Sequence, residues 1–390
     1  MGPAGPMTSP APYDLAPLGV ILLVGGLLAL APVAWVWLRQ GERTPAKRLR
    51  ALTWMTLFLT FDLVLFGAFT RLSDSGLGCP DWPGCYGSAS PAGAAPHIDA
   101  AQAAMPTGPV TQGKAWIEMA HRYLATAVGA LITALAALAW WAAWRRRPGA
   151  SPWWATFTFV WVCVQGAFGA LTVTMKLYPA IVTLHLLGGI GLLVLLAAQV
   201  QSTDAKALSL SRALVAGAAA VALLAFVQIA LGGWVSTNYA VLACRDFPTC
   251  QGTWWPPMDF AAGFSLRRGL GLAADGGYLP FAALTAIHEA HRLGAALLLA
   301  ALGILAWRLH RSGSAAARRW AWALVAVGTW QLVSGLSNVV LDWPLPAAVA
   351  HTGGAAALAV LLTLLLARAL RARGGTSATR PATVSARPDS

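Results

Sequence analysis

Nine apolar stretches of about 20 residues or more divide this sequence of 390 residues. A bilayer core about 30 Å thick needs roughly 20 apolar residues per helix, so each stretch is long enough to cross a membrane. The stretches cover approximately residues 16–38, 51–70, 117–144, 153–174, 180–200, 213–235, 284–307, 320–340 and 346–367. The sequence therefore predicts an all-α integral membrane protein with nine spans.

The composition agrees with this prediction. Hydrophobic residues make up 57% of the chain and charged residues only 11%, whereas an ordinary soluble domain is about 25% charged. A soluble enzyme is therefore excluded. Disorder of the whole chain is excluded as well, because 19 tryptophans and the long apolar runs would not stay solvated.

The basic residues are distributed unevenly along the chain. Of the 27 lysines and arginines, 19 lie in alternate connections between the spans and in the C-terminal tail. Positively charged connections stay in the cytoplasm, so this alternation predicts an outer N-terminus and a cytoplasmic C-terminus. Two long outer loops follow, at about 71–116 and 236–283. The net charge of +13 is then a topology signal, and no nucleic-acid partner is expected.

The sequence repeats itself with an offset near 166 residues. The segment Cys79-Pro-Asp-Trp-Pro-Gly-Cys85 matches Cys244-Arg-Asp-Phe-Pro-Thr-Cys250, and His-Arg pairs and later histidines match as well. Each half has four spans, and an even number makes the halves parallel, related by an axis along the membrane normal. We expect a pseudo-duplicated pair of four-helix bundles, eight core spans, plus one extra N-terminal span. The predicted units are 1–50 (extra helix and basic linker), 51–202, 203–372 and a disordered tail, 373–390.

Four histidines occupy matching positions in the two halves: His121, His185, His291 and His351. Each lies near the outer end of its span, so all four share one depth. A lone histidine on an apolar helix is usually a packing residue, but ionisable groups inside membranes are costly and usually functional. Two histidines from facing helices of a bundle suit axial ligation of a heme. Structural zinc, which needs four ligands at one point, fits less well.

Glycines flank the last histidine of each half: Gly188, Gly189, Gly353 and Gly354. They would let a macrocycle approach the backbone, or they serve close packing of the helices. Both readings stay open.

The cysteine pairs lie in the predicted outer loops, which face an oxidising compartment. Their spacing of six differs from that of a zinc knuckle or a thioredoxin motif. We therefore expect disulfide-closed loops at Cys79–Cys85 and Cys244–Cys250. A plain staple and a redox or heme-transfer role remain alternatives. The fifth cysteine, Cys163, is expected to pack inside its span.

Glu118 distinguishes the two halves. It stands three residues before His121 on the same helical face, where the repeat places His288. This difference predicts different tasks for the halves, although a glutamate solvated at a helix N-terminus is the simpler alternative. Arg122 and Arg292 follow the first histidine of each half. They are candidates for contacts to heme propionates or for snorkelling to the headgroups.

These motifs resemble one family, the heme A synthases of bacterial and mitochondrial respiratory chains. The resemblance covers about residues 50–370. It rests on Thr70-Arg71-Leu-Ser-Asp-Ser-Gly-Leu77 leading into the first cysteine loop, on Glu118-Met-Ala-His121-Arg122, and on the repeated histidine helices. The family is a pseudo-duplicated bundle of eight spans that oxidises a methyl group of heme O to the formyl group of heme A.

The resemblance implies a role for each candidate residue. His121 and His185 would flank the substrate heme, His291 and His351 would hold a permanent heme b, and Glu118 matches the family's essential acidic residue. The cysteine pairs match those of the family's Cys-containing branch, in which the first pair is linked to heme handling. A bacterial plasma-membrane location is implied, with heme O synthase, membrane lipid and an unidentified electron acceptor as partners. A homo-oligomer stays open.

The chain departs from the family in three features. These are the extra N-terminal span, the long first outer loop at about 86–113, and Asp62, near where the repeat has Gln228. Two other classes remain as alternatives: a di-heme b-type membrane cytochrome that transfers electrons, and a heme transporter or chaperone. Four histidines at one depth would set two hemes side by side, which suits a substrate and its cofactor better than transmembrane electron transfer.

Overall fold

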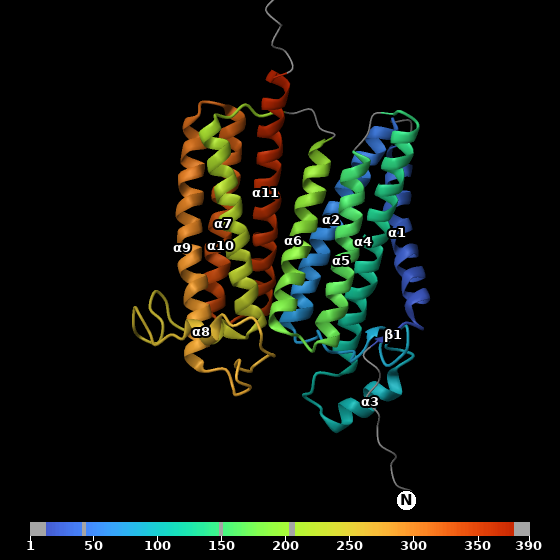
Figure 1. Cartoon of the computed structure of the whole chain (residues 1–390), viewed down its shortest axis with the longest axis vertical. Helices are drawn as coiled ribbons and strands as arrows, with labels where there is room; N and C mark the ends of the chain where they lie inside the picture. Colours follow the sequence, from blue (N-terminus) through green and yellow to red (C-terminus); the bar gives the residue numbers. More distant parts are fainter. Residues whose placement is uncertain (1–12, 41–43, 148–150, 203–206, 378–390) are drawn as a thin grey trace, which may run out of the picture.

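The computed structural model describes residues 13–40, 44–147, 151–202 and 207–377. Within these residues nine helices are long and apolar enough to cross a membrane, which confirms the predicted spans. They are α1 (Leu18–Gln40), α2 (Pro45–Leu72), α4 (Gln112–Trp144), α5 (Pro152–Thr174), α6 (Pro179–Ser202), α7 (Arg212–Thr237), α9 (Phe281–Arg311), α10 (Ala315–Val340) and α11 (Leu345–Ser377). The helices run side by side, with the longer loops gathered at one end (Figure 1).

Capping residues mark where several helices begin. The side chains of Thr111, Ser151, Ser211 and Ser314 each accept a hydrogen bond from a backbone N–H in the first turn of α4, α5, α7 and α10. Such bonds satisfy donors that the helix itself leaves open. Of the tail predicted to be disordered, residues 378–390 lie outside the described residues, and residues 373–377 continue α11.

The helices contact one another in two closed groups. In the first group, α2 contacts α4, α4 contacts α5, α5 contacts α6, and α6 contacts α2. In the second, α7, α9, α10 and α11 contact one another in the same cyclic order. The groups meet through α6 with α7 and α11, and through α2 with α11. Helix α1 stands outside both groups and packs mainly on α4.

Apolar packing fills the part of each group that lies away from the histidines. The first cluster includes Leu131, Leu135 and Leu196, and the second includes Leu305 and Leu362. Because lipid is as apolar as these side chains, close packing rather than escape from water holds the helices together. The histidine end is left to more polar side chains.

The loops at the histidine end contain short ordered elements. In the first loop, strand β2 (Trp82–Pro83) pairs in parallel with β1 (Tyr13–Asp14), and helix α3 (Ala95–Ala104) follows. The second loop contains the 3-10 turn η1 (Ala240–Leu242) and helix α8 (Phe260–Gly263). The segment before α1 therefore forms part of the first cysteine loop.

The prediction for Cys163 is wrong. Its side chain is exposed on α5, on the same outward face as Val160 and Val164. Helix α5 is apolar around its whole circumference, so its sequence pattern does not show which face turns toward the membrane.

Candidate heme-binding site

The structure brings the four predicted histidines together as two pairs. In the first pair, His121 on α4 is close enough to His185 on α6 for the two rings to interact electrostatically. In the second pair, the ring centres of His291 on α9 and His351 on α11 are 6.4 Å apart. Two imidazoles that bind one iron from opposite sides, each through a bond of about 2 Å, have ring centres roughly 6 Å apart. The spacing of the second pair therefore fits bis-histidine ligation of a heme.

A glycine on the preceding helix of each group lies against every one of these rings. A Cβ built on Gly67, Gly232 or Gly335 would come within 3.0, 3.0 and 3.1 Å of Cε1 of His121, His291 and His351, respectively. At Gly169 the corresponding distance to His185 is 3.5 Å, an ordinary contact. The missing side chains thus let the rings pack directly on the helix backbone. Three of these positions would force the ring to move if they carried a methyl group.

The glycines that follow the last histidine of each half, such as Gly188 and Gly354, lie against other side chains. A Cβ on Gly188 would overlap Gln165, at 1.7 Å from its Nε2, and a Cβ on Gly354 would lie 2.5 Å from Trp330 Cδ1. The indole of Trp161 also donates to the carbonyl of Gly188, at 2.8 Å. These glycines make room for side chains of the neighbouring helix, as the packing alternative predicts.

The histidines of the second pair are each held at the second ring nitrogen. Gln228 Nε2 lies 2.8 Å from His291 Nδ1, and Ser334 Oγ lies 2.9 Å from His351 Nδ1. The Ser334 hydroxyl also donates to the carbonyl of Trp330, at 2.7 Å, which leaves its oxygen able to accept from the ring. The Ser334 oxygen can accept from the ring N–H of His351, and such a contact fixes a ligating imidazole and raises its affinity for metal. The Gln228 amide nitrogen can only donate, and it also donates to the His291 carbonyl at 2.9 Å, so it holds the His291 ring in place without accepting its N–H.

The first pair lacks these contacts. The Nδ1 atoms of His121 and His185 are buried and form no hydrogen bond with a side chain among the described residues, although the backbone of Gln165 lies close enough to the His185 ring to interact with it. The positions that match Gln228 and Ser334, at offsets of 165 and 166, hold Leu63 and Phe168. Asp62 itself lies on the exposed face of α2. The two pairs are therefore alike in backbone setting and different in what fixes their rings.

Glu118 is enclosed by the first cysteine loop. Its side chain is 4% exposed, it forms an ion pair with Arg122 one turn further along α4, and its Oε2 accepts a hydrogen bond of 2.8 Å from the backbone N–H of Cys79. The solvated-glutamate alternative is therefore wrong. His288, at the matching position of α9, is also 4% exposed. This repeat position thus holds a buried carboxylate in one half and a buried imidazole in the other.

Arg122 and Arg292 clamp the two cysteine loops. Arg122 donates to the carbonyls of Asp81, Pro83 and Gly84. Arg292 donates to those of Cys244, Asp246 and Thr249. Charged donors form the stronger hydrogen bonds, so each arginine ties its loop to the histidine-bearing helix. A heme propionate contact stays a prediction for both.

Both cysteine pairs form the predicted disulfides, Cys79–Cys85 and Cys244–Cys250. All four cysteines are buried. Ile21 of α1, Ile98 of α3 and Met119 of α4 belong to the apolar cluster around the first disulfide. The extra helix therefore helps to enclose this loop.

An aspartate organises the turn inside each loop. Asp81 accepts from the backbone N–H groups of Tyr86 and Gly87, at 2.6 and 2.7 Å. Asp246 accepts from Gln251 and Gly252, at 2.8 and 3.0 Å. The Thr249 hydroxyl and these backbone donors lower the pKa of Asp246 to about 2. The ionised side chain is thus the form that the second loop requires.

Glu289, which the sequence analysis does not single out, contributes to the second loop. Its Oε1 lies 3.3 Å from Arg292 Nη1 and 3.3 Å from Cys244 Sγ. It therefore takes the place beside the clamping arginine that Glu118 takes in the first half, from a position one residue later in the repeat. The sequence signal for this role is that the acidic residue stands three positions before Arg292 in the second half and four positions before Arg122 in the first.

In the described part of the chain, nine apolar helices with two partly buried histidine pairs at one end define the class: a polytopic helical membrane protein with paired histidine sites. Within this class, the chain belongs to the COX15-CtaA family of cytochrome oxidase assembly proteins, whose family model matches residues 50–365. It is 41% identical over 321 residues to a heme A synthase of Shewanella oneidensis, covering 80% of this chain and 94% of that protein. A heme A synthase of Halalkalibacterium halodurans is 26% identical over 312 residues, covering 78% and 90%.

Proposed function

We propose that this chain is a heme A synthase, a membrane oxidoreductase that converts a methyl group of heme O to the formyl group of heme A. The observation that carries the proposal is the buried carboxylate of Glu118, three residues before His121, at a position where the other half has His288. A chemical step requires one special site, whereas a symmetric electron carrier does not. The likeness to proteins named heme A synthase supports the same activity.

We further propose that the two helix groups are duplicated halves related by a twofold axis along the helices. Arg71 donates to the carbonyl of Ser236 at 2.7 Å, and the Tyr239 hydroxyl donates to Asp74 at 2.6 Å. The residues of each pair are 165 positions apart, the offset between the cysteine loops. Counterparts under a twofold rotation touch only next to its axis, so these contacts support the duplication.

The half that contains Glu118 is assigned to the substrate, with His121 and His185 flanking heme O. The other half is assigned to a resident heme b, with His291 and His351 as axial ligands. The hydrogen bond between His351 Nδ1 and Ser334 supports this division, because a permanent cofactor benefits from a fixed ligand. A substrate must bind and leave, and ligands without such partners suit exchange.

When bound, the heme iron supplies the redox chemistry of the two oxidation steps. The side chains position the reacting edge and handle protons. Glu118 is placed to accept a proton from the reacting group or to stabilise positive charge that develops there. Arg122 and the backbone of Cys79 hold this carboxylate in one orientation.

The distribution of charge supports an outer location for the site. Most of the described basic residues lie at the end of the bundle opposite the histidines, which positive-inside topology assigns to the cytoplasm. We therefore place the N-terminus outside the cell and the C-terminus in the cytoplasm of a bacterial plasma membrane. Heme O synthase is the expected supplier of substrate, since an apolar heme must be handed over within the membrane.

The pigments of the purified protein test this assignment. The chain is expressed together with a heme O synthase, purified, and its extracted hemes are separated. Heme B accompanied by heme O or heme A is the expected result. Two equivalents of heme B alone would instead identify a di-heme electron-transfer cytochrome.

A further inference from the structure

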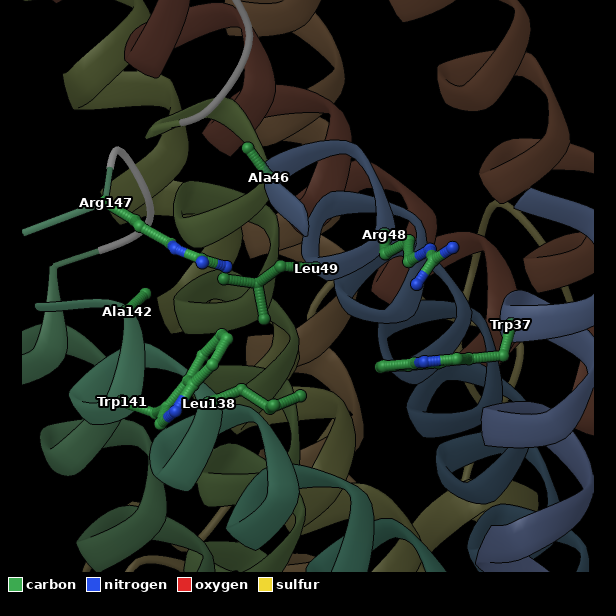
Figure 2. A pocket seen from close by; sticks show the side chains of 8 residues that line it. All are labelled: Trp37, Ala46, Arg48, Leu49, Leu138, Trp141, Ala142 and Arg147. Atoms are coloured by element: carbon green, nitrogen blue, oxygen red, sulfur yellow. The ribbon is translucent and has the colours of Figure 1, made fainter. Parts of the chain in front are cut away.

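A cavity of about 390 Å³ lies at the end of the bundle opposite the histidines, between α1, α2 and α4 (Figure 2). Its lining is Trp37, Ala46, Arg48, Leu49, Leu138, Trp141, Ala142 and Arg147. The walls are apolar except for the two arginines. Because Trp37 belongs to α1, the extra N-terminal helix completes this cavity.

Each arginine of the cavity lies close to a tryptophan. The Arg147 guanidinium lies 5.0 Å from the Trp141 ring centre, and that of Arg48 lies 6.0 Å from the Trp37 ring centre. Figure 2 shows the Arg147 side chain extending toward Leu49, with Arg48 on the other side of the cavity. Cation–π contacts of this kind hold a guanidinium in place. Two guanidiniums at one cavity favour a phosphate, which each can bind in bidentate geometry.

The charge around the cavity is positive throughout the described part of the chain. Of the described aspartates and glutamates, only Asp62 in the middle of α2 lies away from the histidine end. Lys47, Arg50, Arg145 and Arg146 flank the cavity instead. In the sequence, residues 39–50 contain five arginines and lysines against one acid, Glu42, and residues 145–147 are three arginines. This excess of positive charge favours an anionic ligand.

We propose that this cavity binds an anionic phospholipid, with the phosphate at the basic rim that Arg48 and Arg147 form and an acyl chain along Leu49 and Leu138. The cavity lies where membrane-spanning helices end and tryptophans mark the headgroup level. Basic pockets between such helices bind anionic headgroups. The apolar walls select a lipid over a free phosphate or a nucleotide. This site is separate from the histidine pairs, so it does not depend on the proposed function.

The test is a lipid titration of the whole protein purified in a neutral detergent. Thermal unfolding is followed while phosphatidylglycerol, phosphatidylcholine or glycerol 3-phosphate is added. We expect phosphatidylglycerol alone to raise the unfolding temperature, since a ligand that binds the folded state stabilises it. An equal rise with phosphatidylcholine, or with glycerol 3-phosphate, would overturn the proposal. This comparison uses the unchanged protein.

Matched variants then locate the lipid. Each arginine near the membrane surface contributes about fivefold to the affinity for an anionic lipid, so R48Q/R147Q is expected to bind phosphatidylglycerol about 25-fold more weakly. The control R212Q/R319Q removes the same charge at the same end of the second helix group and is expected to change the affinity less than about twofold. Equal weakening in both variants, or none in R48Q/R147Q, contradicts a site at this cavity.

Discussion

The backbone N–H of Cys79 donates to the carboxylate of Glu118, with a nitrogen–oxygen distance of 2.8 Å. This contact joins the first disulfide loop to the residue that distinguishes the two histidine pairs. Arg122 reinforces this connection, since it pairs with Glu118 and donates to three carbonyls of the same loop. The loop and the carboxylate therefore form one unit, and a change in the loop is expected to reach the chemistry.

Removal of the first disulfide tests that connection. In C79S/C85S the loop that orients Glu118 is less constrained, and we expect heme A formation to fall by about tenfold while heme b is retained. The matched control is C244S/C250S, whose loop contacts Glu289 instead. Separation of the extracted hemes measures both effects. Equal heme A formation by C79S/C85S and the unchanged chain would show that the loop does not position Glu118.

Loss of the Ser334 hydroxyl is expected to weaken the resident heme. Ser334→Ala leaves His351 Nδ1 without its partner at 2.9 Å, and losses of this kind cost about 10–100-fold in metal affinity. Heme titration of the purified variant and its electron paramagnetic resonance spectrum measure the change. An unaltered spectrum and affinity would mean that Ser334 does not position the ligand.

The reverse substitution in the first half provides a gain-of-contact test. Phe168→Ser introduces a hydroxyl at the position that matches Ser334. We expect the variant to retain heme O more tightly and to release product more slowly, because the ring of His185 gains a partner. Phe168→Ala is the control for the lost ring. Identical heme O retention in the serine and alanine variants would contradict this account.

The glycines behind the histidines should differ in their tolerance of alanine. Gly335→Ala brings a methyl group to 3.1 Å from His351 Cε1, whereas Gly169→Ala brings one to only 3.5 Å from His185. We expect Gly335→Ala to shift the Soret band of the bound heme and lower its occupancy, and Gly169→Ala to change neither. Absorption spectra of the two purified variants make the comparison.

The second cysteine loop should resist acid. Its Asp246 has a pKa near 2, below the ordinary value of 3.8, because the Thr249 hydroxyl and backbone N–H groups bind the ionised form. Because the folded loop binds the ionised form of Asp246, this side chain stabilises the fold at pH values above its ordinary pKa of 3.8. The contribution is lost as the pH falls from about 4 toward 2. We expect the Cys244–Cys250 bond to resist a phosphine reductant at pH 5 and to become accessible near pH 2. Asp246→Asn should expose the bond at both pH values, whereas Asp275→Asn, a change on an exposed part of the same loop, should not.

The spans and the histidine pairs are predictable from sequence because each depends on a strong local or repeated signal. A run of about 20 apolar residues predicts a span without knowledge of its neighbours, and the repeated His-Arg motif predicts that His121 and His291 share a depth. The facing of an apolar helix is not encoded in this way, because lipid and protein interior are equally apolar. Cys163 was misplaced for that reason.

The fine structure of the site depends on contacts between distant segments. Gly67 and Gly232 matter only because α4 and α9 bring a ring against them. Gln228 likewise acquires its role from a histidine 63 positions away. The ion pairs of Glu118 and Glu289 follow from helical spacing, since each lies one turn before its arginine. The contacts of these arginines with the loop carbonyls depend on the fold.

The hemes extracted from Glu118→Gln test the central claim most directly. The variant keeps a side chain of the same length but cannot accept a proton as a carboxylate does, and Glu289→Gln is its control at the other loop. With a heme O synthase present, we predict that Glu118→Gln retains heme B and accumulates heme O without heme A, while Glu289→Gln still forms heme A. Normal heme A formation by Glu118→Gln would contradict the role assigned to this residue.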